Sequence, residues 1–156
     1  MYDRILLAFD GSREGLIALR EGALLARRFE AQVFLLSVLN SSALGAAGPD
    51  GSYVDASNDM IEASNAMLER GVAAATRLGL SPTAHLLIGE PAAQIGAYAR
   101  EIKAELVVVG HRRQGMLERW WSGSTGANVS DHVDCSVLIG RTVISDDDFR
   151  AELLPE

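Results

Sequence analysis

The sequence contains a single cysteine and only four prolines. Cys135 cannot form an intrachain disulfide, and its apolar surroundings favour a buried small residue over a reactive thiolate. A fold held together by disulfides is therefore excluded, and a reducing compartment is compatible with the chain. With 48% hydrophobic residues among 156, the composition fits one ordinary domain around a single core.

Basic charge and long apolar runs are also scarce. Lys and Arg number 14 against 21 Asp and Glu, which gives a net charge of -7. This charge repels polyanions, so nucleic acid and anionic membranes are disfavoured as partners. Near the start, Asp3 and Arg4 precede only a short apolar run, so neither a signal peptide nor a membrane span is expected. The expectation is a cytoplasmic protein.

The common signatures of nucleotide and metal enzymes are missing. The sequence has no GxGxxG after its first apolar run and no Walker-type GK[ST], which disfavours dinucleotide dehydrogenases and P-loop enzymes. His85, His111 and His132 lie far apart, without an HExxH motif or paired cysteines, so a metal cluster is not indicated. A triad of Ser124, His111 and Asp10 lacks the GxSxG elbow and is disfavoured as well.

Short apolar runs alternate with segments of helical spacing. The runs predict strands that are buried on both faces, as in a parallel sheet, at residues 5–9, 33–39, 84–88, 106–109 and 137–139. The alternation predicts an α/β fold, a doubly wound five-stranded parallel sheet with four helices on its two faces. Helix ends agree with this pattern; the candidate start and stop residues are Ser12, Ser57 or Asn58, Gly79, Pro91 and Ser124.

Two segments interrupt the alternation. Residues 40–57 are rich in Gly, Ser and Ala and predict a long mobile loop over one end of the sheet. Residues 144–156 concentrate acid at Asp146, Asp147 and Asp148, and they predict a short surface helix capped by Asp, with an interaction tail as the alternative. The chain is accordingly divided into a main domain, residues 1–144, and an acidic tail, residues 145–156.

Polar residues and glycines follow the ends of the predicted strands. Ligands of open parallel sheets bind beyond the carboxyl ends of the strands, near the point where the strand order reverses. Asp10, Gly89 and Gly110 stand at or next to three such exits, and Glu90 is placed to cap the third helix. Gly123 and Ser124 then begin the last predicted helix, whose free N–H groups attract anions. A phosphate site and a plain turn with a plain helix cap are equally compatible with these residues.

Four stretches of the sequence resemble the universal stress protein family. They are RILLAFDGS, GEPAAQI, VVVGHRR and SGSTGANVSDHVDCSVLIGR, and the resemblance extends over about residues 2–141. The nucleotide-binding branch of that family has the pattern G-2x-G-9x-G-[ST]. Here Gly110, Gly123 and Ser124 take the first Gly, the last Gly and the hydroxyl, whereas Arg113 replaces the second Gly and Gly115 is out of register.

The resemblance implies a Rossmann-like sheet of the adenine nucleotide alpha hydrolase type, with a bound adenine nucleotide. It places Asp10 and Val38 against ribose and adenine, with Ala8 and Phe9 nearby. The phosphate side would be lined by Val109, Gly110, His111, Arg112, Gly123, Ser124 and Thr125. The implied ligand is ATP with Mg²⁺, which Ser124 or Thr125 would reach, and AMP or cyclic AMP remains open. The family pattern also implies a homodimer that pairs the last strand, Ser136 to Val143, with its symmetry mate.

Arg113 leaves two outcomes open for nucleotide binding. If the family glycine has a left-handed backbone, an Arg costs about 1–2 kcal/mol there and its β-carbon takes phosphate space. If the backbone is ordinary, the guanidinium can donate charge-assisted hydrogen bonds to phosphate oxygens. A solvated surface side chain is the third interpretation.

The predicted function is that of a nucleotide-responsive regulator of the stress response, with at most slow ATP hydrolysis. The sequence identifies no group that would position an attacking water, so no catalytic residue is assigned. One alternative is a stress protein without nucleotide that acts through dimer surfaces and protein partners. A second alternative is a true nucleotide-dependent hydrolase or ligase of related architecture.

Overall fold

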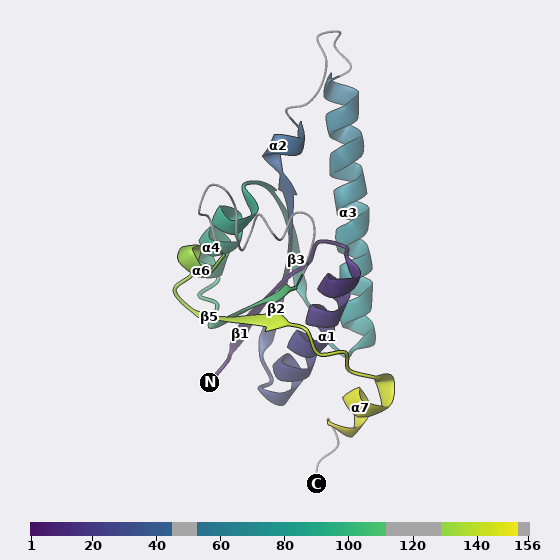
Figure 1. Cartoon of the computed structure of the whole chain (residues 1–156), viewed down its shortest axis with the longest axis vertical. Helices are drawn as coiled ribbons and strands as arrows, with labels where there is room; N and C mark the ends of the chain where they lie inside the picture. The colour runs from purple at the N-terminus through teal and green to yellow at the C-terminus, as the bar shows by residue number, and fades with distance from the viewer. Residues whose placement is uncertain (45–52, 112–128, 153–156) are drawn as a thin grey trace.

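The centre of the molecule is a parallel sheet, seen in a computed structural model that describes residues 1–44, 53–111 and 129–152 (Figure 1). These residues form one sheet of five strands in the order β3-β2-β1-β4-β5. Each strand lies within one residue of its predicted position; the strands are β1 (Arg4–Ala8), β2 (Gln32–Asn40), β3 (Thr83–Gly89), β4 (Leu106–Gly110) and β5 (Ser136–Gly140). The parallel, doubly wound α/β fold is therefore confirmed.

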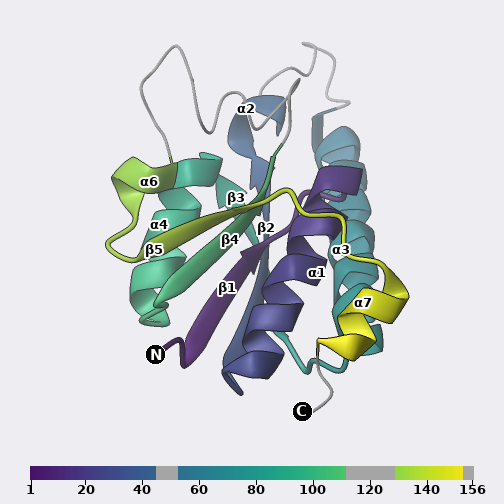
Figure 2. The same cartoon turned by 60° about the horizontal axis from the view of Figure 1, so that its bottom comes forward.

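Helices cover both faces of the sheet (Figure 2). Helices α1 (Arg13–Arg28) and α3 (Tyr53–Arg77) lie on one face. Helices α4 (Pro91–Glu101) and α6 (Val129–His132) lie on the other, in contact with each other. None of the helices within the described residues is long and apolar enough to cross a membrane.

The apolar residues of β1 divide between two cores. Ile5 and Leu7 pack with α1 and α3, whereas Leu6 and Ala8 pack with α4 on the opposite face. Successive side chains of a strand point to opposite faces of the sheet. When helices cover both faces, every side chain of the strand is buried, and no position faces water. This explains why the central strands are continuous apolar runs in the sequence.

Several predicted helix ends are confirmed. The Ser12 hydroxyl accepts a hydrogen bond from the Gly15 N–H at 2.9 Å and caps α1. The Glu90 carboxylate accepts the N–H groups of residues 92 and 93 at 3.2 and 2.7 Å, and Pro91 opens α4. Gly79 follows the end of α3 with a φ of +82°, a backbone conformation that other residues adopt only with strain.

The prediction of one long loop over residues 40–57 is wrong at both of its ends. Asn40 is the last residue of β2, and a short helix, α2 (Ser41–Leu44), follows it directly. The Asn40 side chain caps this helix by accepting the Ser42 N–H at 3.0 Å. Helix α3 already begins at Tyr53, so Ser57 and Asn58 do not start it. Because no Gly or Pro stands between Tyr53 and those residues, nothing in the sequence stops the helix from extending upstream.

The acidic segment near the C-terminus forms the expected short helix, α7 (Asp146–Ala151), but its cap differs from the prediction. The Ser145 hydroxyl caps the helix by accepting a hydrogen bond from the Asp148 N–H at 3.1 Å. The aspartates occupy the first turn, where their negative charge interacts favourably with the positive end of the helix dipole. Phe149 is buried against the core on the α1 face. The predicted helix start at Ser124 lies outside the described residues.

Cys135 behaves as its apolar surroundings predicted. The residue is partly buried and packs against the core on the α4 face. Burial, followed by the nearby negative charge of Asp134, raises the pKa of the Cys135 thiol above its usual value. The thiol is therefore protonated at neutral pH and is a poor nucleophile.

Candidate functional site

The strand order reverses between β1 and β4, because β2 and β3 follow on one side of β1 and β4 and β5 on the other. All five strands are parallel, so their carboxyl ends meet at one edge of the sheet. Phe9 and Asp10 directly follow β1 at that edge, and His111 follows β4. The structure thus brings together the residues that the sequence placed at the ends of these two strands, at the position where open parallel sheets bind ligands.

Val38 lies near the carboxyl end of β2, the strand next to β1. The register pairs Ala8 with Leu36, and the ladder continues beyond β1, since the Phe9 N–H donates to the Leu36 carbonyl at 2.8 Å. Asp10 follows in the turn after β1, and Val38 is among the last three residues of β2, so both stand at the carboxyl edge of the sheet. A carboxylate and an aliphatic side chain therefore lie at the same edge, which suits a ligand with both a hydroxyl-bearing and an apolar part.

Ser37 fixes this edge and was not identified from the sequence. Its side chain is fully buried, and its hydroxyl donates to the Phe9 carbonyl at 2.7 Å. The bond ties the end of β1 to β2 beyond the last strand residue. The available signal was a lone polar residue within the apolar run of β2.

Asp10 is held by a tight turn into α1. Its Oδ1 accepts the Ser12 N–H at 3.0 Å and also the Ser12 hydroxyl. Gly11, between them, has a φ of +78°, so the turn requires a residue without a β-carbon. Ser12 then caps α1, so one chain of hydrogen bonds fixes both the helix start and the aspartate.

Gly110 is required by close packing against α1. A β-carbon at this position would lie 2.7 Å from the Glu14 carbonyl oxygen and 2.8 Å from the Gly15 nitrogen. Both atoms belong to the backbone, so no side-chain rotation relieves the contact. The sequence favoured Gly110 for its approach to a ligand, whereas the structure adds a packing reason: the first turn of α1 lies directly over the end of β4.

The side chains at this edge differ in their access to a ligand. Val109 is fully buried, and Ala8 and Val38 are 7% and 8% exposed, so they offer a small apolar surface. The Phe9 side chain belongs to the core beneath α1 and α3, which leaves only its backbone at the edge. Asp10 and His111 are partly exposed. The remaining predicted ligands, Arg112, Arg113, Gly123, Ser124 and Thr125, lie outside the described residues.

The described residues contain no group of three His, Cys, Asp or Glu side chains that could hold a metal ion. His132 and His85 make different contacts. The His132 backbone carbonyl accepts a hydrogen bond from the Arg100 guanidinium at 2.6 Å, and the centre of the His85 ring lies 5.3 Å from that of the Tyr98 ring.

The chain matches known proteins along most of its length. Residues 1–141 match the model of the universal stress protein family. Universal stress protein MJ0531 of Methanocaldococcus jannaschii is 29% identical over 139 residues, which cover 89% of this chain and 82% of that protein. A universal stress protein solved in complex with cAMP has a TM-score of 0.64 and 23% identity, covering 90% of this chain and 97% of its own. The universal stress protein of Archaeoglobus fulgidus, solved in complex with dAMP, has a TM-score of 0.65 and 24% identity, covering 90% and 98%.

Proposed function

The chain belongs to the universal stress protein family, and we propose that it binds an adenine nucleotide at the carboxyl edge of β1, β2 and β4. The observation that carries the proposal is Asp10, held by Ser12 directly after β1 at the point where the strand order reverses. The cAMP and dAMP complexes of two proteins with the same fold support the choice of an adenine nucleotide. The proposed role is that of a cytoplasmic, nucleotide-responsive regulator of the stress response.

The adenosine half of the ligand uses described residues. Asp10 accepts hydrogen bonds from the ribose hydroxyls, and Val38 with Ala8 provides the apolar surface for adenine. Gly110 and His111 begin the phosphate side. Beyond them we assign the phosphates of ATP to Arg112, Arg113, Gly123, Ser124 and Thr125, with Ser124 reaching Mg²⁺. Any hydrolysis is slow, because these assignments include no group that positions an attacking water.

Replacing Asp10 by alanine tests this assignment. A hydrogen bond to a charged group contributes about 1.5–3 kcal/mol, so we expect the dissociation constants of both ATP and AMP to rise roughly tenfold or more. Calorimetric titration measures both constants with and without magnesium. Glu90→Ala is the matched control, because the Glu90 carboxylate likewise accepts a backbone N–H beside a helix start at this edge but is assigned no ligand contact. Unchanged nucleotide affinity in a folded Asp10→Ala protein would rule out the proposed ribose contact.

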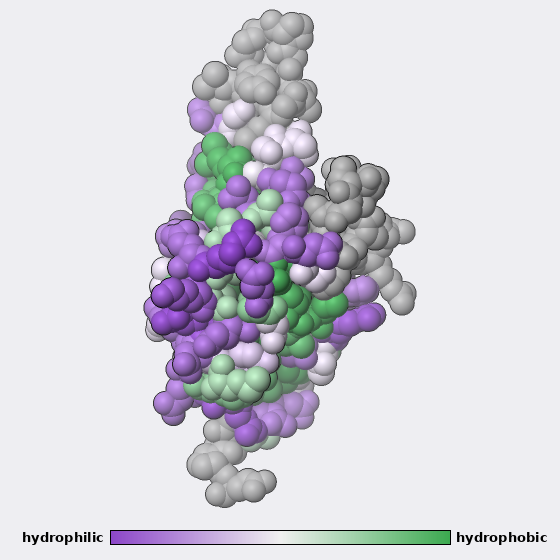
Figure 3. Space-filling model, turned by 90° about the vertical axis from the view of Figure 1, so that its left-hand side faces the viewer, coloured by the Kyte–Doolittle hydropathy of each residue, from purple (hydrophilic) through white to green (hydrophobic). Residues whose placement is uncertain are grey.

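We further propose a homodimer through the last strand and the residues that follow it. β5 is an edge strand, so one row of its backbone groups is open to a second strand. Figure 3 views the side of the molecule that carries α4, α6 and the start of β5, and apolar side chains gather on this face. Val143, just beyond β5, is 70% exposed. An exposed aliphatic residue beside an open edge favours self-association.

Val143→Glu is expected to shift the protein from dimer to monomer, because like charges would meet across the two-fold axis. Light scattering coupled to gel filtration measures the mass. Ile88→Glu serves as the control, since Ile88 is 44% exposed on β3, the opposite edge strand. A monomeric wild type, or a dimer that Ile88→Glu disrupts and Val143→Glu does not, would contradict the proposed interface.

A stress protein that works without nucleotide is the second candidate. The observation that favours it is Arg113, which stands where the nucleotide-binding pattern has glycine. In that case protein partners would take over the regulatory role. The effect of Arg113→Gly, described in the Discussion, separates the two candidates.

A further inference from the structure

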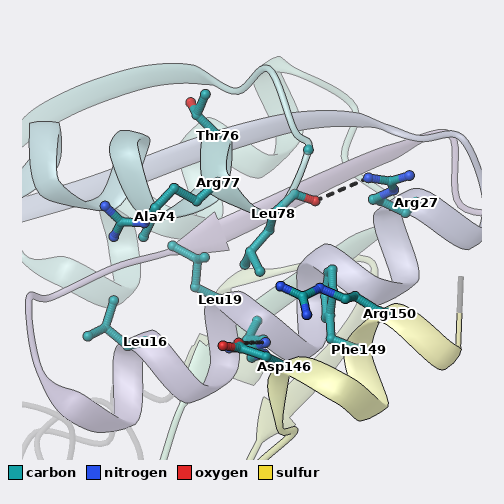
Figure 4. A pocket seen from close by; sticks show the side chains of 12 residues that line it. Leu16, Leu19, Arg27, Ala74, Thr76, Arg77, Leu78, Asp146, Phe149 and Arg150 are labelled. Carbon is teal, nitrogen blue, oxygen red and sulfur yellow. Dashed lines mark hydrogen bonds and ion pairs between the residues drawn. The ribbon is translucent and has the colours of Figure 1, made fainter.

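A hollow lined by residues of α1, the end of α3 and α7 shares no residue with the nucleotide edge (Figure 4). It is an open groove of about 1090 Å³ between α1, the end of α3 and α7. Its size is at the upper limit of pockets for small molecules, and its openness suits a peptide segment better than an enclosed ligand. None of the residues assigned to the nucleotide lines it.

The groove has an apolar floor and a basic rim. Leu16, Leu19, Ala74, Leu78 and Phe149 supply the apolar surface. Four arginines from three helices line it. Arg20 and Arg150 pair with Asp146 and Asp147 of α7, and the other two are Arg27 and Arg77. Figure 4 shows three of them, from α1, α3 and α7, around Leu19 and Leu78. On a chain with a net charge of -7, such a concentration of positive charge marks a local preference for acidic groups.

Helix α7 is itself an acidic segment that packs beside α1 through an aromatic side chain and an ion pair. Phe149 is 5% exposed and serves as an aromatic anchor. Asp146 forms an ion pair with Arg20, whose guanidinium carbon lies 5.2 Å from the centre of the Phe149 ring. The hydrogen bond from Arg20 lowers the pKa of the Asp146 carboxyl below its usual value. Glu152, just past the helix, pairs with Arg28 at 2.6 Å.

The other two arginines of the groove, Arg27 and Arg77, do not pair with the carboxylates of α7 in the part of the chain that the structure describes. Arg27 donates only a long hydrogen bond, 3.4 Å, to the Leu78 carbonyl. Arg77 is exposed, and within the described residues neither it nor Arg27 forms an ion pair. Both guanidinium groups are thus available to carboxylates beside the surface that α7 occupies.

We propose that this groove is a docking site for an acidic, amphipathic segment of a partner protein. Leucine or aromatic side chains of the segment pack on Leu16, which is 45% exposed, and on Leu78, and its carboxylates pair with Arg27 and Arg77. The segment would lie alongside α7. Like α7, it would bury an apolar or aromatic side chain and pair a carboxylate with an arginine. The proposal does not depend on nucleotide binding, because the two sites share no residue.

The test uses a fluorescein-labelled model peptide in which Leu and Phe at helical spacing are separated by Glu. Fluorescence anisotropy measures its binding to the full chain. We expect Arg27→Glu with Arg77→Glu to weaken the binding roughly tenfold or more, because each reversal replaces an attraction by a repulsion. The control is Arg70→Glu with Lys103→Glu, which changes the net charge equally at two exposed positions that do not line the groove. This control is expected to bind as the wild type does.

Further comparisons make the result decisive. A peptide with Lys in place of Glu should not bind, and the acidic peptide should bind more weakly as salt rises. Amide chemical shifts should change along α1, α3 and α7 only. Arg77→Glu alone, at an exposed position, keeps the test valid if the double variant does not fold. The proposal is overturned if the wild type does not bind the acidic peptide, if the Lys peptide binds equally, or if both double variants lose affinity to the same extent. Binding to anionic lipid vesicles in place of the peptide would also overturn it.

Discussion

Replacing Gly110 by alanine is expected to destabilise the protein and to weaken adenine-nucleotide binding together. The new β-carbon would meet the Glu14 carbonyl oxygen at 2.7 Å and the Gly15 nitrogen at 2.8 Å, both part of the α1 backbone. Because neither atom can rotate away, the start of α1 must shift from the end of β4. Overpacking of this kind typically costs about 1–3 kcal/mol of unfolding free energy. The same shift moves the turn that holds Asp10.

Gly96→Ala separates the two effects. Its β-carbon would collide with the His132 carbonyl oxygen of α6, and neither α4 nor α6 contributes a residue assigned to the nucleotide. We expect this variant to lose stability in chemical denaturation and to keep its affinity for ATP and AMP. If Gly110→Ala kept wild-type nucleotide affinity despite its loss of stability, the end of β4 would not belong to the binding site.

Arg113→Gly is expected to weaken ATP binding roughly tenfold and to leave AMP binding nearly unchanged. The reason is that a guanidinium in the phosphate region donates charge-assisted hydrogen bonds to the β- and γ-phosphates, which AMP lacks. Calorimetric titration of both nucleotides, each with and without magnesium, measures the difference, and AMP is the internal control.

The opposite result would change the function assigned to the protein. If the wild type bound no nucleotide and Arg113→Gly bound ATP, the arginine would close a pocket that glycine leaves open. The protein would then act through its dimer and partner surfaces without nucleotide. Equal ATP affinity in both proteins would identify Arg113 as a solvated side chain.

The sheet could be predicted from the sequence because its central strands are buried on both faces. A run such as residues 5–9 has no reason to contain polar residues when α1 and α4 cover its two sides. Helix starts were predictable where a side chain satisfies the first N–H groups, as Ser12 and Glu90 do. The start of α3 is not predictable in this way, because Ser57 and Asn58, the candidate caps, lie inside a helix that begins at Tyr53.

The candidate site was predicted less completely than the sheet. The position of Asp10 follows from strand order alone, but the contact between Gly110 and the backbone of Glu14 depends on how closely α1 approaches β4. Ser37 gave only a weak signal, one hydroxyl in an apolar strand. The basic groove could not be predicted, because its residues come from three helices distant in sequence and because α7 is held against α1 by Phe149 and by the ion pairs of Asp146 and Glu152.

The central claim is that an adenine nucleotide binds where β1, β2 and β4 end. Titration of the isotope-labelled protein with ATP, followed by amide chemical shifts, tests it most directly. We expect the largest changes at residues 8–12, at Val38 and at residues 109–111, while the amides of α7 and the end of α3 stay unchanged. The absence of changes at saturating ATP, or changes centred on the α1, α3 and α7 groove, would contradict it.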